Sequence, residues 1–443
     1  MSTITVIPDT SVVSKVSPTF SYDAHDRKNM DFEIFIDGQN IKNTGLHNYL
    51  QSIRIERNFP NQDRIDLNFA NPDSALLTSM TKFFPGKILS AKVGWKETGL
   101  TDIGEYVLTN PKYNFYKSGP GMHLQLTGFD NTMVLTRHGE VQKFWDNVTD
   151  SDIAIEIANK YGFAKDIDKT TVKYADGVVQ AAQTDLDFLK SRARLHGFLT
   201  YVKKNTLHFH PYRVVDNGAK LGYARKGYNI TDLNISVVTH RKYAIHKKSQ
   251  VDPVTLQVHE VSSSNLPDEL YKNQSLKYSP FAVVTAGGNS QAQEFVIGEG
   301  HLQTEDEIKT QINKFQESSG WSLVKLSGNA HGAEFLIPGE LVNINIQDQT
   351  RFAGEFLCTS VIHTLSSGDG IHRRGFNTQF ELRRSFLGAD QKDIDFVKNS
   401  ILLIIFQMQF ISKFLQGTLF FDNKLASGDI AELQPTGNVV TLI

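Results

Sequence analysis

The chain has 443 residues, of which 40% are hydrophobic and 21% are charged, and its formal net charge at pH 7 is −2. This length favours two to four domains, and the composition is ordinary for a soluble globular protein. A charge so close to zero argues against nucleic-acid binding. Cys358 is the only cysteine, which excludes an internal disulfide and is typical of synthesis in a reducing compartment.

Strand patterns dominate the first third of the chain. Residues 1–30 are polar and irregular, which predicts an N-terminal arm, and the apolar–polar alternation of strands begins after them. Asp37-Gly38 marks a hairpin turn. Residues 31–135 are therefore expected to form a first small β-barrel or sandwich of about six strands. We expect these strands at 32–36, 49–57, 64–69, 88–94, 104–109 and 122–127.

The period then changes, and residues 145–215 are expected to form a small α+β insert. Thr149 can cap a first helix that ends at Gly162, and a second helix begins at Thr184. A hairpin follows directly, with Lys203-Lys204-Asn205 as its turn.

Strands return after the insert and are expected to form a second β-barrel from residues 220–258 and 322–387. Residues 259–321 separate its two parts and mostly lack a clear period. Thr304 and Glu307 form a capping box near the end of this segment. The pattern predicts a long loop followed by a helix.

A C-terminal extension, residues 388–443, contains the apolar stretch 401–421. A membrane span needs about 20 mostly apolar residues, and the second half of this stretch holds too many polar ones. Four of those polar residues repeat with helical spacing and form one face. We interpret the stretch as a helix that is buried or covered by a partner, with a membrane segment as the alternative. Its candidate interface residues are Ile401, Ile405, Phe410 and Phe414.

One short β-module occurs twice, about 250 residues apart. Each copy has a Pro-Gly pair, which suits the two central positions of a type II turn, and then a Gly-Glu-aromatic sequence that begins a strand. Two similar modules in one chain suggest a building part that presents equivalent surfaces, which enzymes rarely need. The resulting candidate interface residues are Pro85, Gly86, Gly104, Glu105, Pro338, Gly339, Gly354 and Glu355.

No pattern of residues predicts catalysis or a cofactor. His208 and His210 are two apart in an expected strand, so both point to one face and could place two metal ligands. No third ligand stands at a telling distance, and no metal is therefore predicted. Asp185 and Asp187 begin a helix, where they complement its dipole better than they form a hydrolytic pair. Phosphate-binding loops, His-Glu-x-x-His and Gly-x-Ser-x-Gly motifs are absent from the sequence.

Several segments carry a family resemblance. In the insert these are Gln183-Thr184-Asp185-Leu186-Asp187-Phe188-Leu189, His196-Gly197-Phe198 and Asn205-Thr206-Leu207-His208-Phe209. In the two modules they are Val93-Gly94-Trp95, Ile103-Gly104-Glu105, Pro338-Gly339-Glu340-Leu341-Val342 and Phe380-Glu381-Leu382-Arg383-Arg384. Their order and spacing resemble the bacteriophage late control protein D family, the central tail hubs of contractile phages. The hub region of type VI secretion spikes is similar, and the resemblance covers roughly residues 30–388.

The resemblance implies a mainly β protein with an α+β insert and two similar small β-barrels per chain, assembled as a trimeric ring with pseudo-six-fold symmetry. Such a ring would join the six-fold tail tube to the three-fold central spike, because two similar modules per chain convert one symmetry into the other. The implied partners are two further copies of the chain, the tube and spike proteins, and possible tape-measure and baseplate wedge proteins. The implied location is the virion tail baseplate, after assembly in the host bacterial cytoplasm.

Two alternatives stay open beside a structural baseplate hub. One is the hub of a related injection or secretion machine. The other is a tail-associated cell-wall hydrolase, although no clefted carboxylate or metal set supports it. The C-terminal extension is short for the oligosaccharide-binding-fold domain of a spike, so we expect the spike to be a separate chain.

Overall fold

The protein is mainly β, with three short helices among its described residues. Its computed structural model describes residues 29–71, 83, 85–115, 122–137, 139–174, 177–213, 215–223, 229–237, 245–251, 258–263, 294–296, 324–347, 349, 352–366 and 375–384. The expected N-terminal arm, the capping box at Thr304 and the C-terminal extension lie outside these residues. No helix in the described part of the chain is long and apolar enough to span a membrane.

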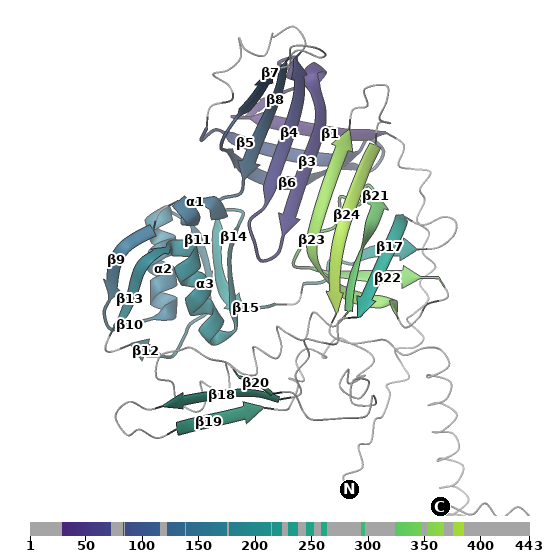
Figure 1. Cartoon of the computed structure of the whole chain (residues 1–443). Helices are drawn as coiled ribbons and strands as arrows, with labels where there is room; N and C mark the ends of the chain where they lie inside the picture. Colours follow the sequence, from purple (N-terminus) through teal and green to yellow (C-terminus); the bar gives the residue numbers. More distant parts are fainter. Residues whose placement is uncertain are drawn as a thin grey trace, which may run out of the picture. The chain divides into compact units, whose positions relative to one another are not determined.

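A 14-stranded sheet forms the centre of the fold (Figure 1). Its first half contains β1 (Met30–Ile36), β2 (Gln39–Asn40), β3 (Leu50–Asn58), β4 (Arg64–Asn71), β5 (Ile88–Trp95), β6 (Gly99–Leu108), β7 (Lys112–Phe115) and β8 (Met122–Phe129). Its second half contains β16 (Ala219–Tyr223), β17 (Ile230–Val237), β21 (Val324–His331), β22 (Leu341–Ile346), β23 (Gly354–Ser366) and β24 (Gly375–Arg384). The sequence therefore predicted the longer strands of the first half, but not the short β2 and β7. In the second half it predicted β17, β24 and the first part of β23, but gave no bounds for β16, β21 or β22. A 3-10 helix, η3 (Leu46–Tyr49), precedes β3.

The two halves are joined by one antiparallel strand pair, β3 with β23. In this internal seam the register sets Ser360 opposite Asn58 and Leu365 opposite Ile53. The strand β23 is long enough to pair with β22 over its first residues and with β3 over its last ones. It therefore belongs to both halves.

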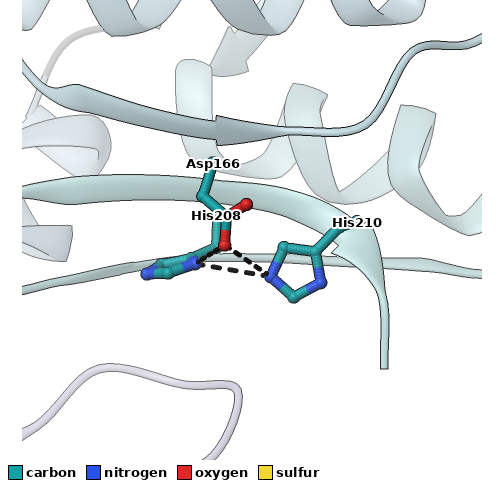
Figure 2. A group of neighbouring side chains, drawn as sticks. All are labelled: Asp166, His208 and His210. Carbon is teal, nitrogen blue, oxygen red and sulfur yellow. Dashed lines mark hydrogen bonds and ion pairs between the residues drawn. The ribbon is translucent and has the colours of Figure 1, made fainter. Parts of the chain in front are cut away.

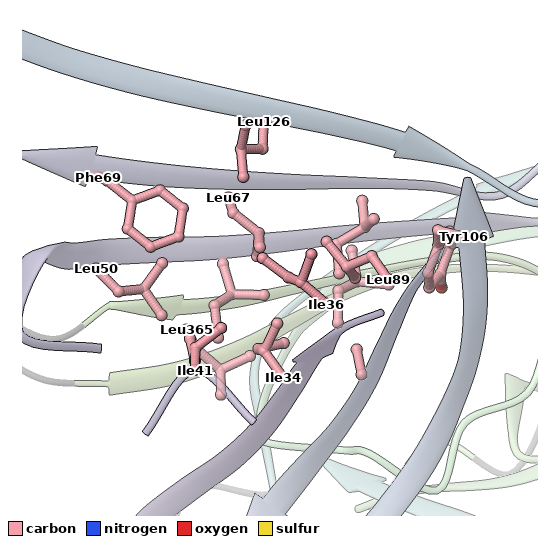
Figure 3. Close-up of a cluster of buried hydrophobic side chains, with 14 of the residues drawn as sticks. Ile34, Ile36, Ile41, Leu50, Leu67, Phe69, Leu89, Tyr106, Leu126 and Leu365 are labelled. Atoms are coloured by element: carbon pink, nitrogen blue, oxygen red, sulfur yellow. The ribbon is translucent and has the colours of Figure 1, made fainter. Parts of the chain in front are cut away.

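Each half has its own apolar core. Alternate residues of β4 show why, because Ile65, Leu67 and Phe69 are fully buried on one face. The first core also takes Leu365 and Phe376 from the second half (Figure 3). The second core includes the buried Cys358, which packs there as a small apolar side chain.

The insert packs three helices against small sheets, and its core includes Leu189 and Phe209. The helices are α1 (Thr132–Arg137), α2 (Asp150–Tyr161) and α3 (Asp185–His196). The strands are β9 (Gly139–Trp145), β10 (Val148–Thr149), β11 (Ala164–Ile167), β12 (Lys173–Tyr174), β13 (Val178–Thr184), β14 (Phe198–Lys203) and β15 (Thr206–Pro211). The sequence predicted α2, α3 and the β14–β15 hairpin, but not α1 or the strands β9 to β13.

Local chemistry sets the ends of both longer helices. The Thr149 side chain accepts a hydrogen bond from the Asp152 N–H, and the Asp152 carboxylate accepts one from the Thr149 N–H, which confirms the predicted cap of α2. Gly162 ends α2 with a positive φ, as predicted. Thr184 caps α3 through its side chain, which accepts a hydrogen bond from the Asp187 N–H.

A separate three-stranded sheet follows β17 in the chain. It is formed by β18 (Ile245–Val251), β19 (Val258–Ser263) and β20 (Glu294–Val296), with β18 in the middle. Residues 220–258 were expected to serve the second barrel as a whole. Instead, β18 pairs with β19 and β20, and none of the three pairs with the 14-stranded sheet.

Candidate functional site

The two Pro-Gly turns have the same backbone geometry. Gly86 and Gly339 have φ values of 93° and 96°, the positive angle that the third position of a type II turn requires. The Gly86 N–H donates to the Leu108 carbonyl at 2.8 Å, and the Gly339 N–H donates to the Cys358 carbonyl at 2.8 Å. Each acceptor residue returns a bond from its own N–H to the residue after the glycine, at 2.8 and 2.9 Å. The repeated sequence therefore forms a repeated structure.

The two Gly-Glu pairs also share a backbone feature, although only Gly354 starts its strand; the predicted start at Gly104 is wrong, because β6 begins at Gly99. Gly104 and Gly354 have φ values of 131° and 112°. Glu105 is exposed, whereas Glu355 is half-buried, and burial together with the nearby charge of Asp216 raises the pKa of Glu355. The two glutamates stand at equivalent positions but in separate halves, so they do not form one acid–base pair.

The order of strands is the same in both halves. In the first half the neighbours run β3, β4, β8, β6, β5, and in the second they run β17, β21, β24, β23, β22. In the first half, β6 is followed by the short strand β7, which continues in the same direction and pairs with β8. In the second half, the last part of β23 has this place and pairs with β24. The likeness stops after β5 and β22, because β1 pairs antiparallel with β5 but β16 pairs parallel with β22.

An irregularity of pairing recurs at the same place. The β3–β4 register shifts between Leu50 and Ser52, and the β17–β21 register shifts between Ile230 and Asp232. Directly after each shift an asparagine of the neighbouring strand donates to the side chain of the shifted strand. These bonds are Asn68 to Ser52 at 3.0 Å and Asn329 to Asp232 at 2.8 Å. Bulges are specific features of a strand pair, so β17 is the counterpart of β3.

The counterpart of the seam strand β23 is β7, and the two differ in exposure. Leu365 lies opposite Phe376 of β24, and Phe115 lies opposite Met122 of β8 at the matching register position. Leu365 is 2% exposed because β3 covers it, whereas Phe115 is 68% exposed. Among the described strands, β7 pairs with β8 alone.

The candidate interface residues of the second turn lie in contacts within the chain. A side-chain carbon on Gly339 would come within 2.8 Å of the Phe59 ring. The Tyr212 hydroxyl donates to the Gly339 carbonyl at 3.3 Å. A side-chain carbon added at Gly86 would meet no atom of the described residues within 4 Å. The predicted residues Ile401, Ile405, Phe410 and Phe414 lie outside the described residues.

In the insert, three polar side chains form a cluster, of which the sequence pattern indicated only the two histidines. The parallel pairing of β11 with β15 sets Asp166 opposite His208, and His210 points to the same face (Figure 2). The Asp166 Oδ2 atom lies 2.9 Å from His208 Nδ1 and 3.4 Å from His210 Nε2. Asp166 is therefore the third candidate ligand that the sequence did not show. Nothing in its spacing reveals it, since Asp166 and His208 are 42 residues apart.

Charge and burial act against each other in this cluster. Burial raises the pKa of Asp166, but hydrogen bonds from Arg213 and His208 outweigh it, so the pKa lies below its ordinary value. Burial lowers the pKa of His208, which favours a neutral ring. An ionised carboxylate and a neutral imidazole are the forms that bind a metal ion.

The aspartates at the start of α3 have separate roles. The Asp187 N–H donates the cap hydrogen bond of α3 to the Thr184 hydroxyl, and the Asp187 carboxylate accepts from that hydroxyl, in agreement with a structural role at the helix start. Asp185 is almost fully buried and accepts from the Tyr161 hydroxyl at 2.6 Å and from Gln180 at 2.8 Å. It therefore anchors α3 inside the insert and does not only complement the helix dipole.

A family model described as the Alg8 N-terminal domain matches residues 26–367. Among solved structures, the chain is similar to a tail protein from Neisseria meningitidis MC58, with 15% identity, a TM-score of 0.56, and 81% of this chain and 97% of the other covered. It is also similar to the 43 kDa tail protein of prophage MuSo2 from Shewanella oneidensis, with 11% identity, a TM-score of 0.56, and 81% and 99% covered. No curated protein matches the sequence. The chain thus has the fold of these phage tail proteins.

Proposed function

The chain belongs to the Alg8 N-terminal domain family, and from its fold and its repeated halves we propose that it is the structural hub of a phage tail or a related injection machine. The hub is a homotrimer that joins a six-fold tail tube to a three-fold central spike. Its role is mechanical and not enzymatic. In a phage, it resides in the tail baseplate.

The single observation that carries the proposal is the repetition of strand order, turns and bulge in one chain. A three-fold ring of such chains holds six similar modules. It can therefore meet a six-fold partner on one face and a three-fold partner on the other. A monomeric enzyme would gain nothing from this arrangement.

The internal seam supplies a template for the contact between subunits. Within the chain, β3 of the first half pairs with β23 of the second. Their counterparts, β17 and β7, are both edge strands among the described strands of the sheet. Unpaired edges accept a strand from another chain. In the trimer, β7 of one subunit pairs with β17 of the next, so that the seam within each chain alternates with a similar seam between chains.

The template also specifies register. Transferring the β3–β23 pairs to their counterparts sets Phe115 opposite Leu233 of the next subunit and Tyr113 opposite Ile235. Leu233 and Ile235 are partly exposed, whereas their counterparts Ile53 and Ile55 are buried by the seam. The new pairing would cover these apolar side chains, which supports the proposed contact.

The test is the native mass of the chain, alone and with its spike. We expect a trimer of three times 49.7 kDa for the wild type. Phe115→Asp introduces a charge into the proposed contact and should give monomers. Phe144→Asp is the matched control, because Phe144 is 58% exposed on the insert, away from the seam strands. A wild-type monomer even with the spike present, or trimers of Phe115→Asp as stable as those of the control, would refute the proposal.

The C-terminal extension has a role of its own in the proposal. The apolar residues Ile401, Ile405, Phe410 and Phe414 pack within the trimer or against the spike or tape-measure protein. Deleting residues 389–443 should weaken trimer formation or co-purification with the spike. Unchanged trimers and unchanged spike binding would contradict this part and leave the role of the seam intact.

Two alternatives have distinct outcomes. A hub of a secretion or bacteriocin-like machine predicts sheath, tube and spike genes nearby without capsid genes, whereas a phage hub predicts both. A tail-associated cell-wall hydrolase predicts a cleared band in a peptidoglycan zymogram, and the structural role predicts none.

A further inference from the structure

Asp166, His208 and His210 converge on one point beside the place where the chain leaves the insert. His208 and His210 come from β15, and Asp166 comes from the parallel neighbour β11. Only Asp166 is exposed to a sizeable degree, and His210 is buried. The three candidate ligand atoms all lie within 4.8 Å of one another (Figure 2).

The separations between these atoms are those of a zinc coordination shell. They are 2.9 Å from His208 Nδ1 to Asp166 Oδ2, 3.4 Å from His210 Nε2 to the same oxygen, and 3.3 Å between the two nitrogens. Tetrahedral zinc has bonds of about 2.0–2.1 Å to histidine nitrogen and carboxylate oxygen. Such a tetrahedron has edges of about 3.3 Å. One ion at the centre would therefore fit with little movement of the side chains.

The tautomer of His210 points to the same conclusion. Its Nδ1 atom contacts the Pro211 carbonyl, which can only accept, so Nδ1 carries the proton. In the neutral ring, Nε2 then has no proton, and its lone pair faces an oxygen of Asp166. Two acceptors face each other stably only with a proton or a cation between them. A backbone carbonyl on the far nitrogen is the usual orienting partner of a metal-binding histidine.

Aromatic and charged side chains border the cluster. The Tyr201 ring stacks on His208 at 4.6 Å with an angle of 12°, and Phe59 of the first half packs edge-on against Tyr201 at 5.2 Å. Arg213 opposes a cation here, because it donates to Asp166 Oδ1 at 2.9 Å, to Asp166 Oδ2 at 3.1 Å and to Asp168 at 2.6 Å. A carboxylate has about four lone-pair sites, so Arg213 can keep its shorter bond to Oδ1 while a metal uses a lone pair of Oδ2 in place of the longer bond.

We propose that Asp166, His208 and His210 bind one zinc ion, with a water molecule in the fourth position, and that this ion ties β11 to β15. The ion would also affect how the insert is connected to the large sheet. Tyr212, directly after β15, donates to Gly339 in the second half, so the ion would steady the connection between insert and sheet. The inference is independent of the proposed hub function.

Metal content of the full-length protein is the direct test. After incubation with zinc and removal of excess, the wild type should hold about one zinc per chain by mass spectrometry. The Co²⁺ form should show the visible absorption of a tetrahedral site. Removing zinc with a chelator should lower the thermal midpoint by at least about 2 °C, and added zinc should restore it.

Two variants and one control locate the ion. His208→Gln and the near-isosteric Asp166→Asn should each reduce bound zinc at least tenfold. His47→Ala removes an exposed histidine far from the cluster in sequence and should keep it. A wild type without bound zinc and without the Co²⁺ spectrum would overturn the proposal and leave only a shared proton in the cluster. Full zinc binding by both cluster variants would overturn it too.

Discussion

Gly332 follows strand β21 and lies against the Trp95 ring of the first half of the sheet, so Gly332→Ala tests the contact between the two halves. The backbone at Gly332 has a φ of 50°, in the left-handed region. A side-chain carbon there would stand 2.1 Å from Trp95 Cζ2 and 2.9 Å from Cδ1 of Phe376. Trp95 is 2% exposed, and its indole N–H donates to the Gly332 carbonyl and to Glu334, each at 3.2 Å.

The expected loss of unfolding free energy has two parts. The left-handed backbone costs an alanine about 1–2 kcal/mol. Displacing a buried indole by overpacking costs about 1–3 kcal/mol more. We therefore expect Gly332→Ala to lose about 2–5 kcal/mol in total. Gly218→Ala is the matched control, because Gly218 has a φ of 72° with no atom within 4 Å of the added carbon. It should lose only the backbone part.

Urea unfolding followed by circular dichroism measures both losses without using tryptophan as the reporter. The difference between the two variants should be about 1–3 kcal/mol. In a Trp95→Leu background the ring is gone, and the difference should shrink to the part that the Phe376 contact causes, as a double-mutant cycle reports. Equal losses for Gly332→Ala and Gly218→Ala in the wild-type background would refute the close contact between Gly332 and Trp95.

Two further predictions concern one buried and one capping residue. Burial lowers the pKa of His363 to about 3, so the unfolded chain takes up a proton below pH 6.5 while the native protein does not. The contribution of His363 to the free energy of unfolding is therefore fully present above pH 6.5 and is smaller by about 2 kcal/mol at pH 5. His363→Leu should lack this decrease when urea unfolding is measured at both pH values. Parallel pH profiles of the wild type and the variant would contradict this. Thr149→Ala should cost about 1 kcal/mol because the cap of α2 is lost, whereas Thr149→Ser should cost much less. Equal losses of unfolding free energy for Thr149→Ala and Thr149→Ser in urea unfolding would contradict the capping role of Thr149.

The parts of the fold that local chemistry controls were predictable from the sequence. The caps at Thr149 and Thr184 act over three residues, and the glycines that end the helices need only their own backbone angle. The Pro85-Gly86 and Pro338-Gly339 turns also follow from neighbouring residues. Matching these short patterns along the chain was enough to find the repeated module.

The candidate sites depended on contacts that no short pattern contains. The sequence placed His208 and His210 on one face, but Asp166 joins them only because β11 pairs in parallel with β15. The strand β7 was missed because four residues give too little alternation to recognise. Its exposed Phe115 can be recognised as a candidate contact residue only by comparison with the buried Leu365, its counterpart in the seam.

The sequence by itself determined the turns, the helix ends, the alternation of the main strands and the presence of two similar modules. The tertiary structure alone decided that β3 pairs with β23, where Ser360 meets Asn58 across 302 residues of chain, and that Asp166 meets the two histidines. The physical reason is the range of the interactions. A cap or a turn is stabilised by atoms a few residues apart, whereas a strand edge can pair with any free edge, and its partner is chosen by the packing of the whole chain.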